Sequence, residues 1–545
     1  MGVIIKNRRF VALCLILLIA TALRIYQLGS VPFGVTHDEL GYIFNAFSIS
    51  KTEANVFGEK FPFLTWMVEG GFPFLPVPIY VSSVFFFFLP LSSFSGRLPS
   101  ALLGIGDVFL LYLLVRRLFS SERLALLSSF FLAISPWHLH FSRSAYDPNF
   151  ALFFFLLGSV VFLWEAEKKV FPLLSTVSFF LAVFSYRGMS VIFFPLALLL
   201  LWFIRQDFRM KGQQFLLRLL SVGFVAASFF MIVSLYGQSY TKEALFFNDP
   251  KLQESVDKEI REAKGSLQLR RIFLNKATFL LGTLSSNYLN TYSPEFLFLH
   301  TEPHTIYSIW SRGRVYFVDI FFIATGIFYL MSRKKRAAIF IFGCILLGGL
   351  PGMIGGMPYS ARNFFIALFL PVLTAGGVLG VLNYCKKRYT YSVAVLAIML
   401  VYSYSLGHYL FDYYERYAYQ AAESWAKSLK DVSVLINSEK NSHDEVIVGN
   451  ATFGDLVQYA FYAHISAERV QASWQDRLVS QTGPSEFQLE NVRFFRDCQV
   501  VAPKQEDEKE RKVLLIQHDD CDKKHTPSLK IQDYFGNTVW KVYEL

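Results

Sequence analysis

Apolar residues gather in separated runs along the chain, and most runs are long enough to cross a bilayer as helices. A helix needs roughly 20 mostly apolar residues to span about 30 Å of hydrocarbon. Eleven runs fit, at Phe10–Leu28, Leu98–Val115, Leu124–Trp137, Phe150–Trp164, Phe171–Phe184, Val191–Ile204, Phe215–Leu235, Val315–Met331, Ala337–Ile354, Phe364–Leu382 and Tyr391–Leu410. The pattern predicts an α-helical, polytopic membrane bundle of about 11 transmembrane helices.

A twelfth run, Pro78–Phe94, is ambiguous, and the basic residues guide its interpretation. If it does not cross, the later basic clusters share one side with Lys6, Arg8 and Arg9, as the positive-inside rule requires of cytoplasmic loops. If it crosses, all of them move outside. These clusters are Arg116/Arg117/Arg123, Lys168/Lys169, Arg205/Arg209/Lys211, Arg333–Arg336 and Lys386–Arg388. We therefore predict a cytoplasmic N-terminus and an interfacial or re-entrant helix at Pro78–Phe94.

This topology divides the chain into a membrane domain, residues 1–410, and an extracytoplasmic domain, residues 411–545. The long first loop, Gly29–Phe94, is also extracytoplasmic. The tail alternates strand-like runs with a helical one, which predicts a small α/β domain. The strand-like runs are Glu445–Val448, Val513–Gln517 and Val539–Tyr543, and the helix is Phe453–His464. Cys498 and Cys521, the only cysteines of the tail, are a candidate disulfide in an oxidising compartment.

Composition agrees with a membrane location. The 545 residues are 53% hydrophobic and only 17% charged, whereas soluble domains are about 25% charged. The net charge of +10 comes from the clusters between apolar runs, so it indicates cytoplasmic loops rather than nucleic-acid binding. No Walker loop, G-x-S-x-G elbow or C-x-x-C pair is present, which leaves nucleotide hydrolysis and serine hydrolase chemistry without support.

The strongest local signal is the segment Thr36–Tyr42, which contains His37, Asp38 and Glu39 directly after the first span. Charge at a membrane edge is costly and therefore suggests function. The alternative is a helix start, in which Thr36 caps the helix and the two acids complement its dipole. Both interpretations stay open on local sequence alone.

Further ionisable residues gather on the same predicted side. Arginine suits bidentate phosphate recognition, so their convergence suggests an anionic ligand, although each arginine alone is better explained by contact with headgroups. The candidate substrate-binding residues are His37, Glu69, Arg143, Asp147, Arg187 and Arg362. No metal-ligand spacing is present, so no metal site is predicted and a divalent cation is not required; the cofactor stays unknown.

In order along the chain, several motifs resemble the GT-C membrane glycosyltransferases. They are the acidic pair after the first span, Arg97–Ser100, Ser135–His138, Phe141–Arg143 and Ser293–Phe298. The chain is most similar to the bacterial protein O-mannosyltransferase and aminoarabinose-transferase group, glycosyltransferase family thirty-nine. This resemblance implies a polyprenyl-phosphate-linked sugar donor. It also implies a protein, lipid or cell-wall acceptor, membrane lipids as surroundings, and an active site on the outer face of the bacterial cytoplasmic membrane.

The resemblance also implies residue roles. Asp38 matches the family's catalytic acid, with Glu39 as a positioning or electrostatic partner, while Arg187 and Arg362 match its phosphate-binding arginines. Members often carry Lys-Pro-Pro where this chain has Phe74–Pro78, so Arg97 or Arg143 is expected to replace the missing lysine. The rival function is a transporter or flippase without chemistry. Asp107, an acid in the middle of a span, is the residue that favours it.

Overall fold

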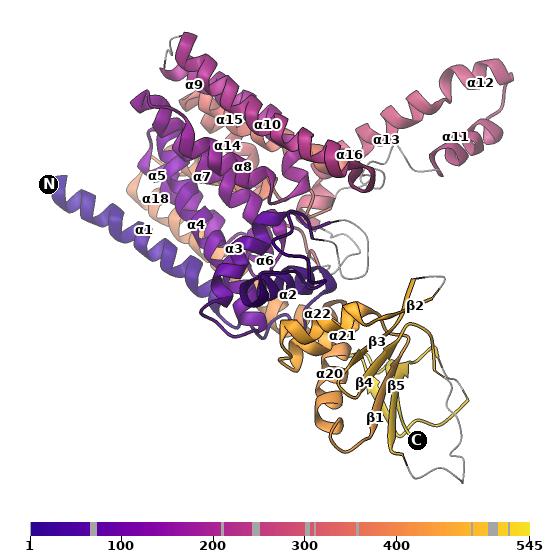
Figure 1. Cartoon of the computed structure of the whole chain (residues 1–545). Coiled ribbons are helices and arrows are strands. Elements are labelled where there is room, and N and C mark those ends of the chain that lie inside the picture. The colour runs from indigo at the N-terminus through magenta and orange to yellow at the C-terminus, as the bar shows by residue number, and fades with distance from the viewer. Residues whose placement is uncertain are drawn as a thin grey trace. The chain divides into compact units, whose positions relative to one another are not determined.

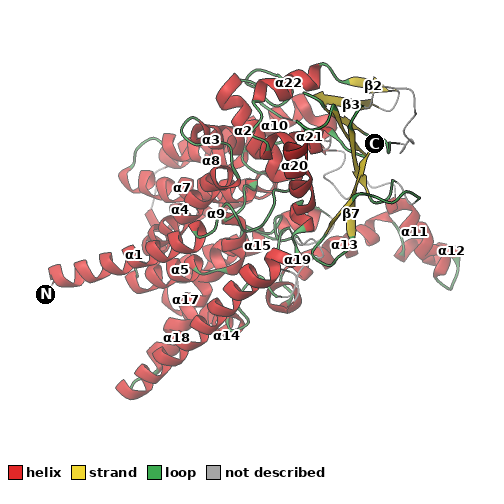
Figure 2. Ribbon diagram, turned by 90° about the horizontal axis from the view of Figure 1, so that it is seen from below, coloured by secondary structure: helices red, strands yellow, loops and turns green. Residues whose placement is uncertain are grey.

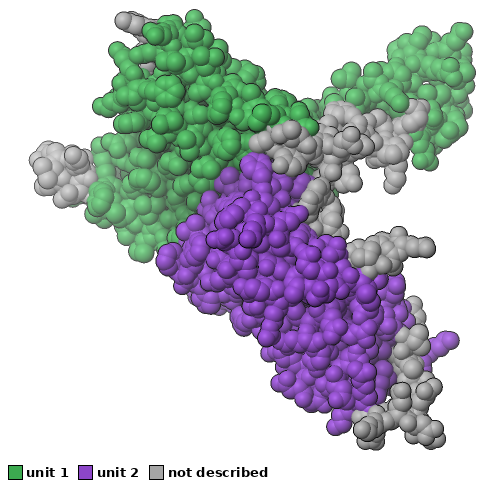
Figure 3. Space-filling model, in the orientation of Figure 1, with its two compact units in different colours: residues 1–25, 100–143, 147–409 green, residues 26–99, 144–146, 410–545 purple. Residues whose placement is uncertain are grey.

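The structure is a computed structural model in which helices predominate and the strands form one sheet (Figures 1 and 2). It describes residues 2–65, 73–208, 212–241, 251–299, 306–309, 312–355, 359–480, 483–499, 511–521 and 524–545. Contacts between residues divide the chain into two compact units, coloured in Figure 3. Unit 1 comprises residues 1–25, 100–143 and 147–409, and unit 2 comprises residues 26–99, 144–146 and 410–545.

Unit 1 is helical. Its helices are α1 (Gly2–Ile25), α4 (Ser93–Phe119, which begins in unit 2), α5 (Glu122–Ala133), α6 (Pro136–Ser142), α7 (Asp147–Lys168), α8 (Leu173–Val183), α9 (Arg187–Phe208), α10 (Gly212–Thr241), α11 (Lys251–Glu262), α12 (Leu267–Phe273), α13 (Lys276–Thr291), α14 (Asp319–Arg333), α15 (Lys335–Leu347), α16 (Leu350–Ile354), α17 (Ile366–Tyr384) and α18 (Arg388–Phe411, which ends in unit 2). Nine of the 11 predicted runs each fall on one of these helices, whereas Leu124–Trp137 covers α5 and the start of α6, and Ala337–Ile354 covers α15 and α16.

Among the described residues, seven helices are long and apolar enough to cross a membrane, or up to eight if the bent pair α5–α6 is one span. The seven lie at Ser93–Phe119, Asp147–Lys168, Arg187–Asp207, Gly212–Met231, Lys335–Ile354, Ile366–Tyr384 and Arg388–Gln420. Of the other predicted spans, α8 has 11 residues and α14 has 15. The protein is a multi-pass membrane protein, and the number 11 stays a prediction.

Helices α14 and α17 pack closely against each other, and this packing depends on glycine. A Cβ atom added to Gly326 would lie 1.9 Å from the carbonyl oxygen of Leu373, and one added to Gly377 would lie 1.9 Å from that of Phe322. No side chain fits at either position, so the two backbones approach directly.

The run Pro78–Phe94 forms the short helix α3 (Pro76–Phe86) in unit 2. Its 11 residues rise about 16 Å, too little to cross about 30 Å of hydrocarbon. Val84, Phe87 and Phe88 at its end are exposed. A short helix with exposed aromatic residues agrees with the predicted interfacial segment.

Unit 2 joins the first loop to the tail. Its helices are α2 (His37–Thr52), α3, α19 (Ala418–Gln420), α20 (Lys427–Glu439), α21 (Phe453–Tyr462) and α22 (Ala467–Gln475), and its strands are β1 (Glu445–Gly449), β2 (Leu478–Ser480), β3 (Gly483–Leu489), β4 (Val492–Phe495), β5 (Val513–His518), β6 (Leu529–Gln532) and β7 (Thr538–Glu544). The strand order is β2-β3-β4-β1-β5-β7-β6, and β1 pairs parallel with β4 and β5.

The tail therefore contains the predicted strands β1, β5 and β7 and the predicted helix α21. Strands β2, β3, β4 and β6 were not predicted. The division of the chain at residues 410 and 411 stays a prediction, because the contacts group residues 26–99 with the tail instead of with the bundle.

A disulfide joins Cys498, which follows β4, to Cys521, which follows β5, with a Cα–Cα distance of 5.3 Å. It bridges the carboxyl ends of the two strands that flank β1. The bonded pair suggested by the cysteine count is thus present in the fold.

We expect Cys498→Ser to destabilise the sheet by about 3 kcal/mol, because the bond closes a loop with a sequence separation of 23 residues. Thermal unfolding of the purified chain measures this, with Cys385→Ser as the control because Cys385 is a free thiol. Alkylation of both tail cysteines in rapidly quenched, unreduced protein would contradict the bond.

Candidate active site

The acidic segment begins helix α2, and burial distinguishes its three polar residues. The Thr36 side chain caps the helix by accepting a hydrogen bond from the Glu39 N–H at 3.2 Å. His37 is exposed, Asp38 is half-buried and Glu39 is fully buried. Thr36 therefore caps the helix, as the helix-start interpretation predicts, and the two neighbouring carboxylates have different surroundings.

Glu39 and Arg97 form a buried, bidentate ion pair within unit 2. The Arg97 Nε donates to Glu39 Oε1 at 2.9 Å, and Nη2 donates to Oε2 at 2.8 Å. Glu39 Oε1 also accepts from the Ala145 N–H at 2.8 Å. Both side chains are 0% exposed, so the Glu39 carboxylate is fully engaged in holding structure.

The remaining N–H groups of Arg97 hold the first loop. Nη1 donates to the carbonyls of Leu28 and Pro32, and Nη2 donates to that of Gly34 at 2.6 Å. A guanidinium carries five N–H donors, and these bonds together with the two to Glu39 occupy all of them. Arg97 therefore holds protein groups with all of its N–H donors, and the replacement of the family's lysine by Arg97 or Arg143 stays a prediction.

Residues of the tail brace the backbone just before Thr36. A Cβ atom on Gly34 would lie 1.8 Å from the carbonyl oxygen of Trp425, so this approach requires glycine. Lys430 Nζ donates to the carbonyl of Phe33 at 3.1 Å, and Gln458 Nε2 donates to that of Val35 at 3.2 Å. The tail thus positions the acidic segment, a role that the sequence did not reveal.

In unit 1, Asp147, Arg187 and Arg362 surround one tyrosine. Asp147 begins α7, Arg187 begins α9 and Arg362 precedes α17. Burial raises the pKa of Tyr186, and Asp147 raises it further, while Arg362 and Arg187 oppose the shift. These electrostatic effects place all three charged groups in the neighbourhood of the Tyr186 hydroxyl. The structure therefore places three predicted residues near Tyr186, a residue that was not predicted as part of the site.

A pocket lies at this cluster, with about 240 Å³ of empty space. Its polar lining is Tyr186 and Arg362, and its other walls are mostly apolar: Pro148, Ala151, Leu152, Gly188, Met189, Ile192, Phe364 and Phe365. Arg362 Nη1 donates to the carbonyl of Gly355, and its guanidinium carbon lies 4.7 Å from the Tyr359 ring centroid. The pocket combines a cation with an apolar wall.

Arg143 and Glu69 complete the predicted residues. Arg143 is buried and donates from Nη1 to the carbonyls of Leu23 and Arg24, at 2.9 and 3.1 Å, near the end of α1. Glu69 lies outside the described residues. Within the part of the chain that the structure describes, no group of three or more His, Cys, Asp or Glu side chains is placed to hold a metal ion.

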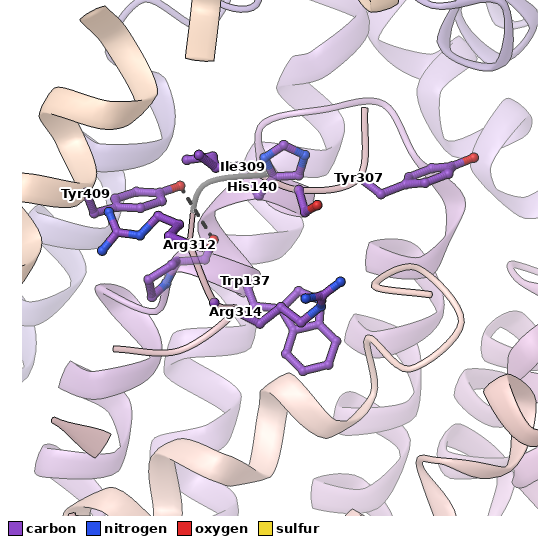
Figure 4. A pocket seen from close by; sticks show the side chains of 10 residues that line it. Trp137, His140, Tyr307, Ile309, Arg312, Arg314 and Tyr409 are labelled. Atoms are coloured by element: carbon purple, nitrogen blue, oxygen red, sulfur yellow. Dashed lines mark hydrogen bonds between the residues drawn. The ribbon is translucent and has the colours of Figure 1, made fainter. Parts of the chain in front are cut away.

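A second cavity in unit 1, with about 280 Å³ of empty space, was not predicted (Figure 4). It is lined by Pro136, Trp137, His140, Tyr307, Ser308, Ile309, Arg312, Gly313, Arg314 and Tyr409. Arg312 lies over the Tyr409 ring, 5.3 Å from its centroid, as Figure 4 shows. Trp137 Nε1 donates to the carbonyl of Ser360, and Arg314 Nε donates to the Ser360 hydroxyl. The lining is cationic and aromatic.

Asp107 belongs to a buried polar network. Its Oδ2 lies 3.2 Å from His138 Nε2, and His138 Nδ1 lies 2.8 Å from Arg24 Nη2. Because an arginine only donates, His138 Nδ1 accepts the hydrogen bond from Arg24. The protonated Nε2 of His138 then donates a hydrogen bond to Asp107 Oδ2. All three side chains are 0% exposed, so the acid in the middle of the span is enclosed by its partners.

The fold is similar to that of the GT-C membrane glycosyltransferases. Residues 73–236 match the family model of the dolichyl-phosphate-mannose-protein mannosyltransferases. An uncharacterized protein of Aquifex aeolicus (strain VF5) is 24% identical over 320 residues, 58% of this chain and 67% of that protein. These findings confirm the predicted resemblance to the protein O-mannosyltransferase and aminoarabinose-transferase group.

Two solved structures extend the likeness in fold to nearly the whole chain. ArnT from Cupriavidus metallidurans, solved with undecaprenyl phosphate, is 11% identical with a TM-score of 0.51, and 97% of each chain is covered. The oligosaccharyltransferase AglB from Archaeoglobus fulgidus, solved with an inhibitory peptide and a dolichol-phosphate, is 16% identical with a TM-score of 0.51. The match covers 84% of this chain and spans 64% of AglB.

The Glu39–Arg97 pair generates a stability prediction. Glu39→Ala and Arg97→Ala should each lower the free energy of unfolding by about 3–5 kcal/mol, because each leaves a buried charge without its partner. The double variant should lose less than the sum of the two. Thermal unfolding in one detergent measures all three, with Arg469→Ala as a control that removes one partner of an exposed pair with Glu490. Single variants as stable as the parent chain would contradict the assigned role.

Proposed function

We propose that the protein transfers a sugar from a polyprenyl-phosphate donor to an acceptor hydroxyl on a protein, lipid or cell-wall polymer. The reaction takes place at the outer face of the bacterial cytoplasmic membrane. The observation that carries this proposal is the pocket at Tyr186, where Arg362 meets a mostly apolar wall beside Arg187 and Asp147.

That combination fits a lipid phosphate. Arg187 and Arg362 supply positive charge, and arginine presents paired N–H donors that match phosphate oxygens. Arg187 also stands at the first turn of α9, where the helix dipole favours an anion. Leu152, Ile192 and Phe365 provide the apolar surface that an isoprenoid chain requires. The undecaprenyl phosphate bound to ArnT and the dolichol-phosphate bound to AglB support a donor of this class.

Asp38 is the general base. The neighbouring Glu39 carboxylate is held by Arg97 and the Ala145 N–H, whereas Asp38 is half-buried and at the start of α2. Asp38 takes the proton of the acceptor hydroxyl while that oxygen attacks the anomeric carbon of the donor. The bond between the anomeric carbon and the phosphate oxygen breaks, and the arginines neutralise the departing polyprenyl phosphate.

The observation that favoured a transporter or flippase has a structural explanation. Asp107 lies in a buried network with His138 and Arg24, and its side chain is 0% exposed. In transporters, acids in the middle of the membrane bind the substrate or the coupling ion and therefore face a cavity. The network therefore supports a role for Asp107 in packing and favours the glycosyltransferase.

Asp38→Asn should lower the rate of sugar transfer on the order of 10²–10⁴-fold, because the amide keeps the shape and removes the proton-accepting charge. Donor binding should stay near the parent value, since the phosphate and lipid contacts belong to other residues. Transfer and donor binding are measured on the same preparation, with Glu59→Gln as a control in the same loop. Near-normal transfer by Asp38→Asn would remove the base from this position.

Arg362→Ala should weaken transfer by about 10–100-fold, the equivalent of losing one charge-assisted hydrogen bond. Arg362→Lys should recover only part of it, because the lysine ammonium lacks the paired donors. Arg261→Ala, on an exposed face of α11, is the matched control. Full transfer by Arg362→Ala in folded protein would exclude Arg362 from the donor site.

A further inference from the structure

Helices α11, α12 and α13 form an arm on unit 1 that extends sideways from the bundle, away from α10 and α15 (Figure 1). The arm is attached along the second half of the span Lys335–Ile354, where α13 also packs against α16. Tyr288 donates from its hydroxyl to the carbonyl of Leu346 at 3.1 Å, and Tyr292 donates to that of Ile345 at 2.9 Å. Both acceptors lie near the end of α15 that is opposite its basic start at Lys335.

The attachment point indicates at which surface of the membrane the arm lies. Basic residues at the start of the span Lys335–Ile354 are typical of the cytoplasmic side. The other end of that span therefore meets the outer membrane surface. Because α13 leaves this end sideways, the arm extends along that surface rather than away from it.

The tip of the arm, α12, exposes an apolar face. None of its residues is buried. Leu269, Ile272 and Phe273 are 55%, 64% and 67% exposed, and their spacing places them on one side of the helix. Packing within the arm therefore leaves three large apolar side chains uncovered.

Cations accompany this face. Residues 264–276 contain four basic residues, Lys264, Arg270, Arg271 and Lys276, and no acid. Arg270 donates to the carbonyls of Gly265 and Ile260, both at 2.9 Å. Arg271 is exposed and lies on the side of α12 opposite to the apolar face. The neighbouring α11 carries four acids and three bases, so the basic charge is specific to the tip.

We propose that the apolar face of α12 inserts into the outer leaflet, and that the basic residues around it contact the phosphates of anionic lipids. A helix with these properties lies in the interface with its apolar side about 5–10 Å into the boundary between headgroups and acyl chains. Basic residues near the surface strengthen binding to anionic lipids. This docking surface does not depend on the proposed reaction.

A fluorescent label at Phe273→Cys tests the proposal in the full chain, with Cys14→Ala, Cys344→Ala and Cys385→Ala present and the disulfide kept. The protein is placed in nanodiscs of phosphatidylglycerol and phosphatidylcholine that contain a nitroxide lipid. The matched control is a label at Glu259→Cys in the acidic helix α11. We expect quenching at 273 several-fold greater than at 259, and a further increase as the phosphatidylglycerol fraction rises.

Two further variants separate the contributions. Leu269→Ser with Ile272→Ser should remove most of the quenching at 273, and Lys264→Gln with Lys276→Gln should reduce its dependence on phosphatidylglycerol. Equal quenching at 273 and 259, or none at 273, would overturn the proposal. Energy transfer between labels at 273 on two copies, without quenching by the nitroxide lipid, would assign the face to a second copy and overturn it as well.

Discussion

The ion pair between Glu39 and Arg97 is the constraint on which the acidic segment depends. One guanidinium, at the beginning of α4, joins the start of α2 to the carbonyls of Leu28, Pro32 and Gly34. Glu39 in turn accepts from the backbone of Ala145. Removing two charges from water is expensive, so such a pair contributes less to stability than to selecting one arrangement of the chain. Here the selected arrangement orients the first turn of α2.

That arrangement gives two adjacent carboxylates different surroundings. The Glu39 carboxylate is fully buried and paired with Arg97, whereas Asp38, one residue earlier in the first turn, is half-buried. The tail reinforces the difference, because Trp425, Lys430 and Gln458 fix the backbone of residues 33–35. The α/β part of the chain thus serves as a support for the first loop, which explains why the contacts group the two.

Hydrophobic runs predicted the helices because length and apolarity are local properties. The short helix α3 and the strands β1, β5 and β7 followed for the same reason. Strands β2, β3, β4 and β6 were missed, and β6 is largely exposed with little apolar alternation. Among site residues, Asp147, Arg187 and Arg362 were expected and now surround Tyr186. The pairing of Glu39 with Arg97 and the approach of Gly34 to Trp425 join distant positions, and no local pattern encodes such contacts.

We propose that this membrane protein breaks the bond between a sugar and a polyprenyl phosphate. The most direct measurement incubates the purified full-length protein in nanodiscs with a polyprenyl-phosphate sugar labelled in both parts and with a membrane extract as acceptor. The account predicts release of free polyprenyl phosphate in step with the appearance of label on an acceptor. A donor that binds and is recovered intact, with the sugar still attached, would contradict it and would favour a carrier of lipid-linked sugars.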